Sequence, residues 1–221
     1  MGSSRSGASL QLRVAEPGVT EAFHRLYYDT AVWKDTYWLG VRTQKCPLDL
    51  WIYQEILFEQ RPDLIIETGT AHGGSALYLA SVCDLLGRGE IVTVDIHPID
   101  GRPAHDRITY LTGSSTAPEV VAEIERLAEG REHVLVILDS DHARDHVLDE
   151  LRVYSRFVSA GGYVIVEDTN VNAHPVFPEH GPGPMEAVEA FLAETNELEV
   201  DSTREKFFLT FNPRGFLRKR A

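Results

Sequence analysis

The chain has 221 residues, which fits one α/β domain with a short N-terminal extension. Its net charge of -13 argues against nucleic acid as a partner, because phosphate binding requires clustered Lys and Arg. No run approaches the roughly 20 apolar residues of a membrane span, and there is no apolar signal sequence, so we expect a cytoplasmic protein with no membrane partner.

The N-terminal part is predicted to be helical. Residues 1–18 read as a disordered leader, and the single domain is expected to cover residues 19–221. A short helix is predicted over 20–29 and a stronger one over 47–59, where proline takes the first helical position. We expect residues 19–60 to form a helical cap on a core of residues 61–221. Apolar residues of the first helix either form a homo-oligomer interface or pack on the domain itself: Phe23, Leu26 and Tyr27.

The remainder alternates between strand-like and helix-like segments. Runs of Val, Ile and Leu that alternate with helices indicate a mostly parallel sheet covered on both faces, hence a doubly wound α/β fold. We expect strands at residues 64–67, 91–95, 108–111, 133–139, 163–167 and, in the segment KFFLTF, 206–211. Helices are expected at residues 73–86, 118–128, 145–157 and 185–194.

Two late segments have no periodicity. Residues 170–184 are rich in Pro, Gly and His, and a loop of this length in a small domain is more often functional than idle, so we interpret it as a substrate lid. The basic cluster at residues 214–220 is interpreted as a solvated tail.

A glycine-rich turn follows the first long strand and opens the next helix. Such a turn lets the backbone approach a nucleotide-type ligand, and Asp95 at the end of the following strand can accept hydrogen bonds from ribose hydroxyls. Glu67 directly before the turn would repel a pyrophosphate but suits the charged methionine end of S-adenosylmethionine, so that cofactor is favoured. The glycines could instead serve only strand-to-helix packing. The expected cofactor residues of the turn are Glu67, Gly69, Thr70, Gly73 and Ser75.

Ser114 and Ser115 follow the third strand, where the adenine or ribose would lie. They could equally cap the helix that follows. Asp139, at the end of the fourth strand, is expected to border the cofactor as well.

Carboxylates end two neighbouring strands. Asp139 and the pair Glu167 and Asp168 are one strand-helix-strand unit apart, so the carboxyl ends of the strands should bring them into one crevice. Three carboxylates repel one another unless a cation lies between them. Mg²⁺ prefers such oxygen ligands, and we predict that these three residues bind it.

Methyl transfer to oxygen also needs a group that takes the hydroxyl proton. His142, three residues after Asp139, is the first candidate for this catalytic role. His174 on the predicted lid is the second.

Several long segments together resemble the cephalosporin hydroxylase family of class I S-adenosylmethionine-dependent methyltransferases, which includes rhamnosyl and other sugar O-methyltransferases. They are PLDLWIYQEI, ETGTAHGGSALYLAS, GSS, LDSDH, GGYVIVEDTN with the following HPV, GPGPMEAVEAFL and KFFLTFNPRGFL, and they cover most of the chain from about Tyr37 onward. The resemblance implies a Rossmann-like seven-stranded sheet with an antiparallel last strand. It also implies that Glu67, Gly69, Ser75 and Asp95 bind the cofactor and that Asp139, Glu167 and Asp168 are the magnesium ligands. In the similar catechol O-methyltransferases a lysine is the base at the position of His142.

The leading hypothesis is therefore an S-adenosylmethionine- and Mg²⁺-dependent O-methyltransferase that acts on a hydroxyl group of a small natural product, with a rhamnose-like sugar as the first candidate acceptor. A hydroxylase or methoxylation component acting on a β-lactam, as the family label suggests, is the alternative enzyme. A non-catalytic partner protein that binds the cofactor is a third reading.

Overall fold

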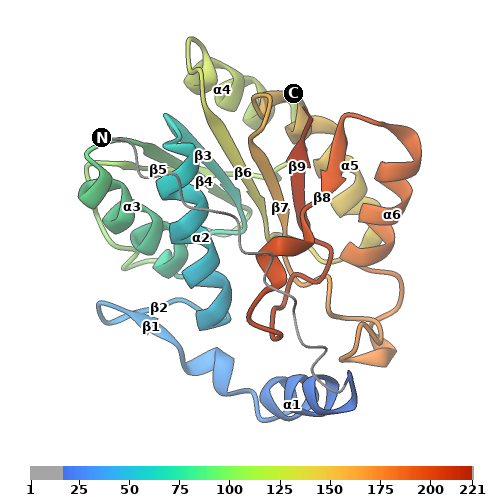
Figure 1. The fold of residues 1–221 in the computed structure, drawn as a ribbon. Helices are drawn as coiled ribbons and strands as arrows, with labels where there is room; N and C mark the ends of the chain where they lie inside the picture. The colour runs from blue at the N-terminus through green and yellow to red at the C-terminus, as the bar shows by residue number, and fades with distance from the viewer. Residues whose placement is uncertain (1–16, 221) are drawn as a thin grey trace, which may run out of the picture.

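A seven-stranded sheet with helices on both faces organises the chain (Figure 1). The structure is a computed structural model and describes residues 17–220, so residues 1–16 of the expected leader lie outside the described residues. The strand order is β5-β4-β3-β6-β7-β9-β8. All neighbours from β5 to β7 pair in parallel, and β9 is antiparallel to both of its neighbours, so the predicted mostly parallel sheet with an antiparallel last strand is confirmed. The strands are β3 (Leu64–Thr68), β4 (Glu90–Asp95), β5 (Ile108–Thr112), β6 (Val134–Leu138), β7 (Tyr163–Val166), β8 (Leu198–Val200) and β9 (Phe216–Lys219).

Each sheet face packs against its own helices because successive strand residues point to opposite sides. In β3, Ile65 lies in the apolar cluster with α2 (Pro47–Gln60) and α3 (Gly74–Leu86). Ile66 lies in the other cluster, with α4 (Pro118–Ala128), α5 (Arg144–Tyr154) and α6 (Pro184–Glu194). Short 3₁₀ turns complete the chain: η1 (Val32–Asp35), η2 (Ser155–Phe157), η3 (Pro178–His180) and η4 (Ser202–Glu205). None of the described helices is long and apolar enough to cross a membrane.

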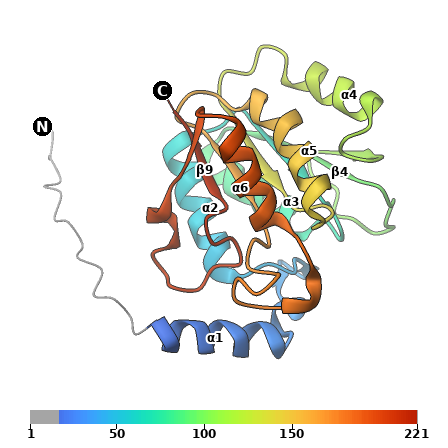
Figure 2. The same ribbon diagram turned by 90° about the vertical axis from the view of Figure 1, so that its right-hand side faces the viewer.

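The N-terminal part lies at the carboxyl ends of the central strands. Helix α1 (Pro17–Asp29) begins three residues before the predicted start and runs along the lower edge of the molecule (Figure 2). His24 of this helix contacts Asn170, which follows β7. A small hairpin that the sequence did not suggest, β1 (Tyr37–Trp38) and β2 (Val41–Arg42), leads from η1 to α2.

The expected strand at residues 206–211 is wrong, because the last strand begins only at Phe216. Residues 206–208 form a turn, and Leu209 and Phe211 instead pack with Cys46 in a separate small core. The solvated tail expected at residues 214–220 is also wrong. Phe216 and Leu217 are fully buried, and their strand pairs with both β7 and β8.

Candidate active site

The glycine turn brings the end of β3 against the end of β6. Gly69 has a φ of +88°, and a Cβ atom there would lie 1.8 Å from the backbone oxygen of Asp139. Only glycine therefore permits this approach. Gly73 at the start of α3 also has a positive φ, of +79°, and its N–H donates to the Thr70 carbonyl at 2.8 Å.

A cavity of about 440 Å³ opens beside this turn at the carboxyl ends of the parallel strands. Four of the predicted cofactor residues line it: Gly69, Asp95, Ser114 and Ser115. The two serines do not cap a helix, since α4 begins at Pro118 after Ala117. Three further lining residues, Ser140, Asp141 and His146, were not predicted for the cofactor, although they stand in the same segment as Asp139.

Asp95 is fixed from several sides. Its carboxylate accepts hydrogen bonds from the N–H groups of Ala71 at 2.8 Å and His97 at 2.9 Å, and Arg102 lies 3.4 Å away. The Ala71 bond ties the glycine turn to the end of β4.

Glu67 at the end of β3 is completely buried and only half satisfied. Its Oε2 accepts a hydrogen bond from Thr93 at 2.6 Å, and Thr93 also pairs with Thr70 at 2.7 Å. Its Oε1 has no hydrogen-bond partner. Burial raises the pKa of the carboxyl above its usual value, although the charge of Lys45 and the hydroxyl groups of Ser75 and Thr93 oppose this shift. An unpaired buried acceptor is costly, so this oxygen suits a ligand that donates a hydrogen bond.

The carboxylates of the two neighbouring strands do meet. The Asp139 N–H extends the β3–β6 pairing with a bond to the Thr68 carbonyl, and the Glu167 N–H does the same toward Leu138. Asp168 has a φ of +53°, and its N–H donates to Asn212 Oδ1 at 3.1 Å, which fixes its backbone at this turn.

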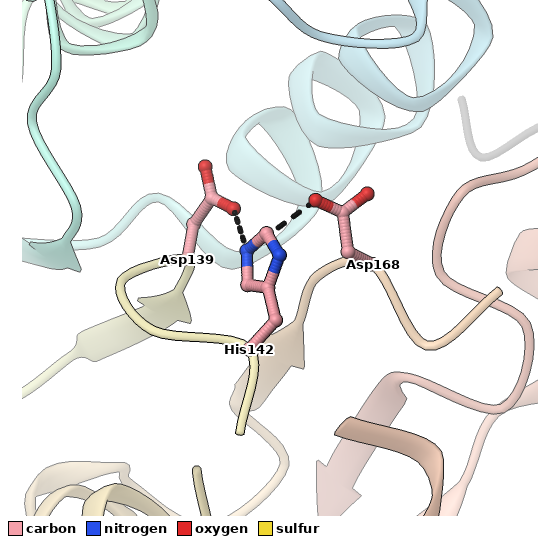
Figure 3. A group of neighbouring side chains, drawn as sticks. All are labelled: Asp139, His142 and Asp168. Carbon is pink, nitrogen blue, oxygen red and sulfur yellow. Dashed lines mark hydrogen bonds and ion pairs between the residues drawn. The ribbon is translucent and has the colours of Figure 1, made fainter. Parts of the chain in front are cut away.

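His142 lies between two of these carboxylates (Figure 3). Its Nε2 is 3.3 Å from Asp139 Oδ1 and 3.4 Å from Asp168 Oδ2. Asp139, His142 and Asp168 each offer one possible metal-ligand atom, and these three atoms lie within 4.8 Å of one another. Burial would lower the pKa of His142, but the charges of Asp168 and Asp139 outweigh it and raise the pKa to about 9.

Lys45 is a member of this cluster that sequence reasoning missed. Its side chain is buried, and Nζ donates to Asp139 Oδ2 and, at 2.5 Å, to Glu167 Oε1. The partners are 94 and 122 residues away in sequence, so no local spacing could have linked them. Burial would raise the pKa of Asp139, but Lys45 and His142 together lower it. For Glu167, burial and the Asp139 charge prevail and raise the pKa.

His174 lies in a different arrangement. Its Nε2 is 2.8 Å from Glu186 Oε1, which also accepts from Asn172 at 2.9 Å, while Glu186 Oε2 accepts from the Gly183 N–H at 2.7 Å. Burial opposes ionisation of Glu186, yet these hydrogen bonds lower its pKa to about 2. The structure thus brings His142 to the carboxylates, whereas His174 fastens residues 170–184 to the start of α6.

Aromatic residues of the N-terminal cap surround Phe211 near Asp168. Phe211 stacks on His24 with ring centroids 5.9 Å apart and contacts Tyr28 and Trp33 edge-on. Burial, and then the charge of Asp168, raise the pKa of Tyr28. This aromatic group therefore lies near Asp168, one of the three carboxylates.

A nucleoside-sized cavity at the glycine turn and an acidic cluster on the next strands define a class I methyltransferase type of site. The model of the family described as Rhamnosyl O-methyltransferase/CmcI matches residues 30–220. The chain belongs to this family, which confirms the resemblance seen in the sequence.

Similar proteins agree with this assignment. A rhamnosyl O-methyltransferase of Mycobacterium bovis (strain BCG / Pasteur 1173P2) is 42% identical over 206 residues, covering 90% of this chain and 84% of the relative. A solved structure described as CmcI-N160 apo-structure is 25% identical with a TM-score of 0.64, over 85% of this chain and 77% of that one. A second, described as cmcI-D160 Mg-SAM, has the same TM-score at 22% identity and covers 85% and 78%, and at that identity it shows the fold alone.

Proposed function

We propose that the protein transfers the methyl group of S-adenosylmethionine to a hydroxyl group of a rhamnose-like sugar, with the help of Mg²⁺. The observation that carries the proposal is the position of Asp139. The backbone of Asp139 lies in close contact with Gly69 at the edge of the nucleoside cavity, and the carboxylate of Asp139 belongs to the acidic cluster. A methyl donor and an acceptor hydroxyl bound at these two places would be neighbours, as methyl transfer requires.

The described residues fit the cofactor. The cavity of about 440 Å³ suits a nucleoside, and Asp95 and the backbone at Gly113 to Ser115 line it. The unpaired Glu67 Oε1 supplies an acceptor for the amino group at the methionine end. S-adenosylmethionine supplies the activated methyl group. The protein contributes its binding and orientation.

The donor set of the acidic cluster fits Mg²⁺. Carboxylate oxygens are the ligands that this ion prefers, and Asp139, Glu167 and Asp168 would hold it. A non-haem iron site would instead show two histidines and one carboxylate, whereas His142 is the only histidine in the described cluster, which favours the methyltransferase over the hydroxylase reading. When bound, Mg²⁺ acidifies and positions the acceptor hydroxyl.

His142 is the residue we assign to accept the hydroxyl proton, a role that requires the neutral imidazole. Against the effect of burial, the charges of Asp168 and Asp139 raise its pKa to about 9, and a cation held by these carboxylates would offset those charges and favour the neutral ring. Asp139 and Asp168 hold the ring, and their charges favour the protonated imidazole that results from proton transfer. The aromatic group formed by His24, Tyr28 and Phe211 would border the acceptor. The mycobacterial relative is described as a rhamnosyl O-methyltransferase, so rhamnosylated acceptors are the substrate class to test first.

The test is a methyl-transfer assay with rhamnosylated acceptors, run with added Mg²⁺ and with a chelator. We expect turnover that requires Mg²⁺ in the wild type and falls at least about 100-fold in Asp139→Asn. Asp106→Asn, in the loop before β5, is the matched control and should keep full activity. Full turnover in chelator, or no binding of S-adenosylmethionine by calorimetry, would refute the proposal. Cytoplasmic location and homo-oligomerisation stay predictions.

A further inference from the structure

Lys45 is held rigidly in the segment between β2 and α2. Both backbone groups of Lys45 are bound to one side chain. Its N–H donates to Thr36 Oγ1 at 3.2 Å, and its carbonyl accepts a hydrogen bond from the same hydroxyl at 3.3 Å. Only 4% of the residue is exposed. The side chain therefore reaches the carboxylates from a fixed base, and its ammonium cannot retreat into bulk water.

Two side chains of the protein, Lys45 and His142, already contact oxygens of this cluster. Lys45 Nζ binds one oxygen each of Asp139 and Glu167, while His142 binds the other oxygen of Asp139 and one oxygen of Asp168. Asp139 and Glu167 are two of the three residues that we propose as magnesium ligands. The ammonium thus occupies one oxygen of each of these two carboxylates, which would otherwise be open to the ion.

We infer that Lys45 is a positioning residue that serves as the built-in counter-cation of Asp139 and Glu167 and weakens Mg²⁺ binding by competing for their oxygens. The inference rests on the proposed function, since it concerns the same metal site. Without Lys45, two buried carboxylates would lack a partner, which destabilises the folded state. With Lys45, a divalent ion must either displace the ammonium or bind beside a like charge.

This role differs from catalysis by Lys45 itself. An ammonium that already binds two carboxylates keeps its proton, so it offers no lone pair to an acceptor hydroxyl. Its effect is to orient the carboxylates and to set how tightly the metal binds. The N-terminal cap, which carries Lys45, thereby becomes part of the metal site.

The test compares Lys45→Gln with wild type by calorimetric Mg²⁺ titration and by thermal unfolding in chelator. Lys206→Gln is the control, because Lys206 pairs with Glu55 at the surface. We expect Lys45→Gln to lower Tm in chelator by about 10 °C, as for a broken buried ion pair, and to bind Mg²⁺ at least about tenfold more tightly. Lys206→Gln should shift Tm by no more than about 2 °C and leave the Mg²⁺ affinity unchanged.

Unchanged or weaker Mg²⁺ binding by a folded Lys45→Gln overturns the inference and leaves the proposed function standing. Absence of Mg²⁺ binding in both proteins overturns the competition and the metal dependence of the proposed function together. If Lys45→Gln does not fold, the double variant Lys45→Gln with Glu167→Gln decides. A counter-cation role predicts that the second change restores Tm, because it removes the unpaired charge. A packing role of the lysine stem predicts a further loss, which would overturn the inference.

Discussion

Replacing Gly69 by alanine tests whether the close approach of β3 and β6 builds the site. The new Cβ would lie 1.8 Å from the Asp139 backbone oxygen, whereas ordinary contacts begin at 3.4 Å. The two strand ends must therefore separate by about 1.6 Å. A displacement of about 1 Å in a catalytic group can cost about 100-fold in rate, so we expect at least that loss of methyl transfer.

Gly101→Ala is the matched control. Gly101 has nearly the same φ, +82° against +88° for Gly69, but a Cβ there meets nothing within 4 Å. Both variants carry the left-handed strain of roughly 1–2 kcal/mol, which lowers Tm by about 5 °C. Only Gly69→Ala should also lose S-adenosylmethionine affinity in calorimetry and turnover in the methyl-transfer assay. Equal activity of the two variants would refute the reasoning.

Three further predictions concern Asp49, a buried residue of α2, then the contact between Glu186 and His174, and finally His142. Burial raises the pKa of Asp49 to about 7, so between about pH 4 and 7 the folded protein holds a proton that the unfolded chain has lost, and stability falls as pH rises. Asp49→Asn should remove up to about 3 kcal/mol of this decline between pH 5 and pH 8, measured by urea unfolding at the two pH values; an equal loss of stability in wild type and variant would contradict it. Glu186→Gln should speed hydrogen exchange in residues 170–184, because the carboxylate that binds His174 is lost; unchanged protection would show that the segment is fastened elsewhere. His142→Gln should lower kcat by about 10² to 10⁴ with unchanged S-adenosylmethionine affinity, and a variant that keeps a tenth of kcat would rule it out as proton acceptor.

The sequence was informative where function lies at strand ends. Apolar runs followed directly by Glu67, Asp95, Asp139 and Glu167 predicted four central strands and the edge at which their last residues meet. The structure places these residues at or directly after β3, β4, β6 and β7, as parallel strand geometry requires. Because neighbouring strand ends are adjacent in any parallel sheet, their proximity did not depend on details of packing.

The sequence was misleading where long-range packing decides. The apolar segment at residues 206–211 has the composition of a strand. In the structure, however, Phe211 packs against aromatic side chains of the cap and pairs with none of the described strands. The next apolar pair, Phe216 and Leu217, stands among arginines and lysines in the sequence, yet in β9 the two side chains are buried on opposite faces of the sheet. Both outcomes depend on which partner surface is available, which residue periodicity does not encode.

The N-terminal cap is the part of the chain whose role changes most in three dimensions. From sequence it was a helical extension that either covered the sheet or formed an interface. In the structure Lys45 reaches Asp139 and Glu167, and His24 binds Asn170 two residues after Asp168. Contacts from the cap thus reach both strand ends that carry the carboxylates. A change in cap position would move the carboxylates relative to the glycine turn, so the cap is a component of the site and its attachment sets the geometry in which a metal and an acceptor would bind.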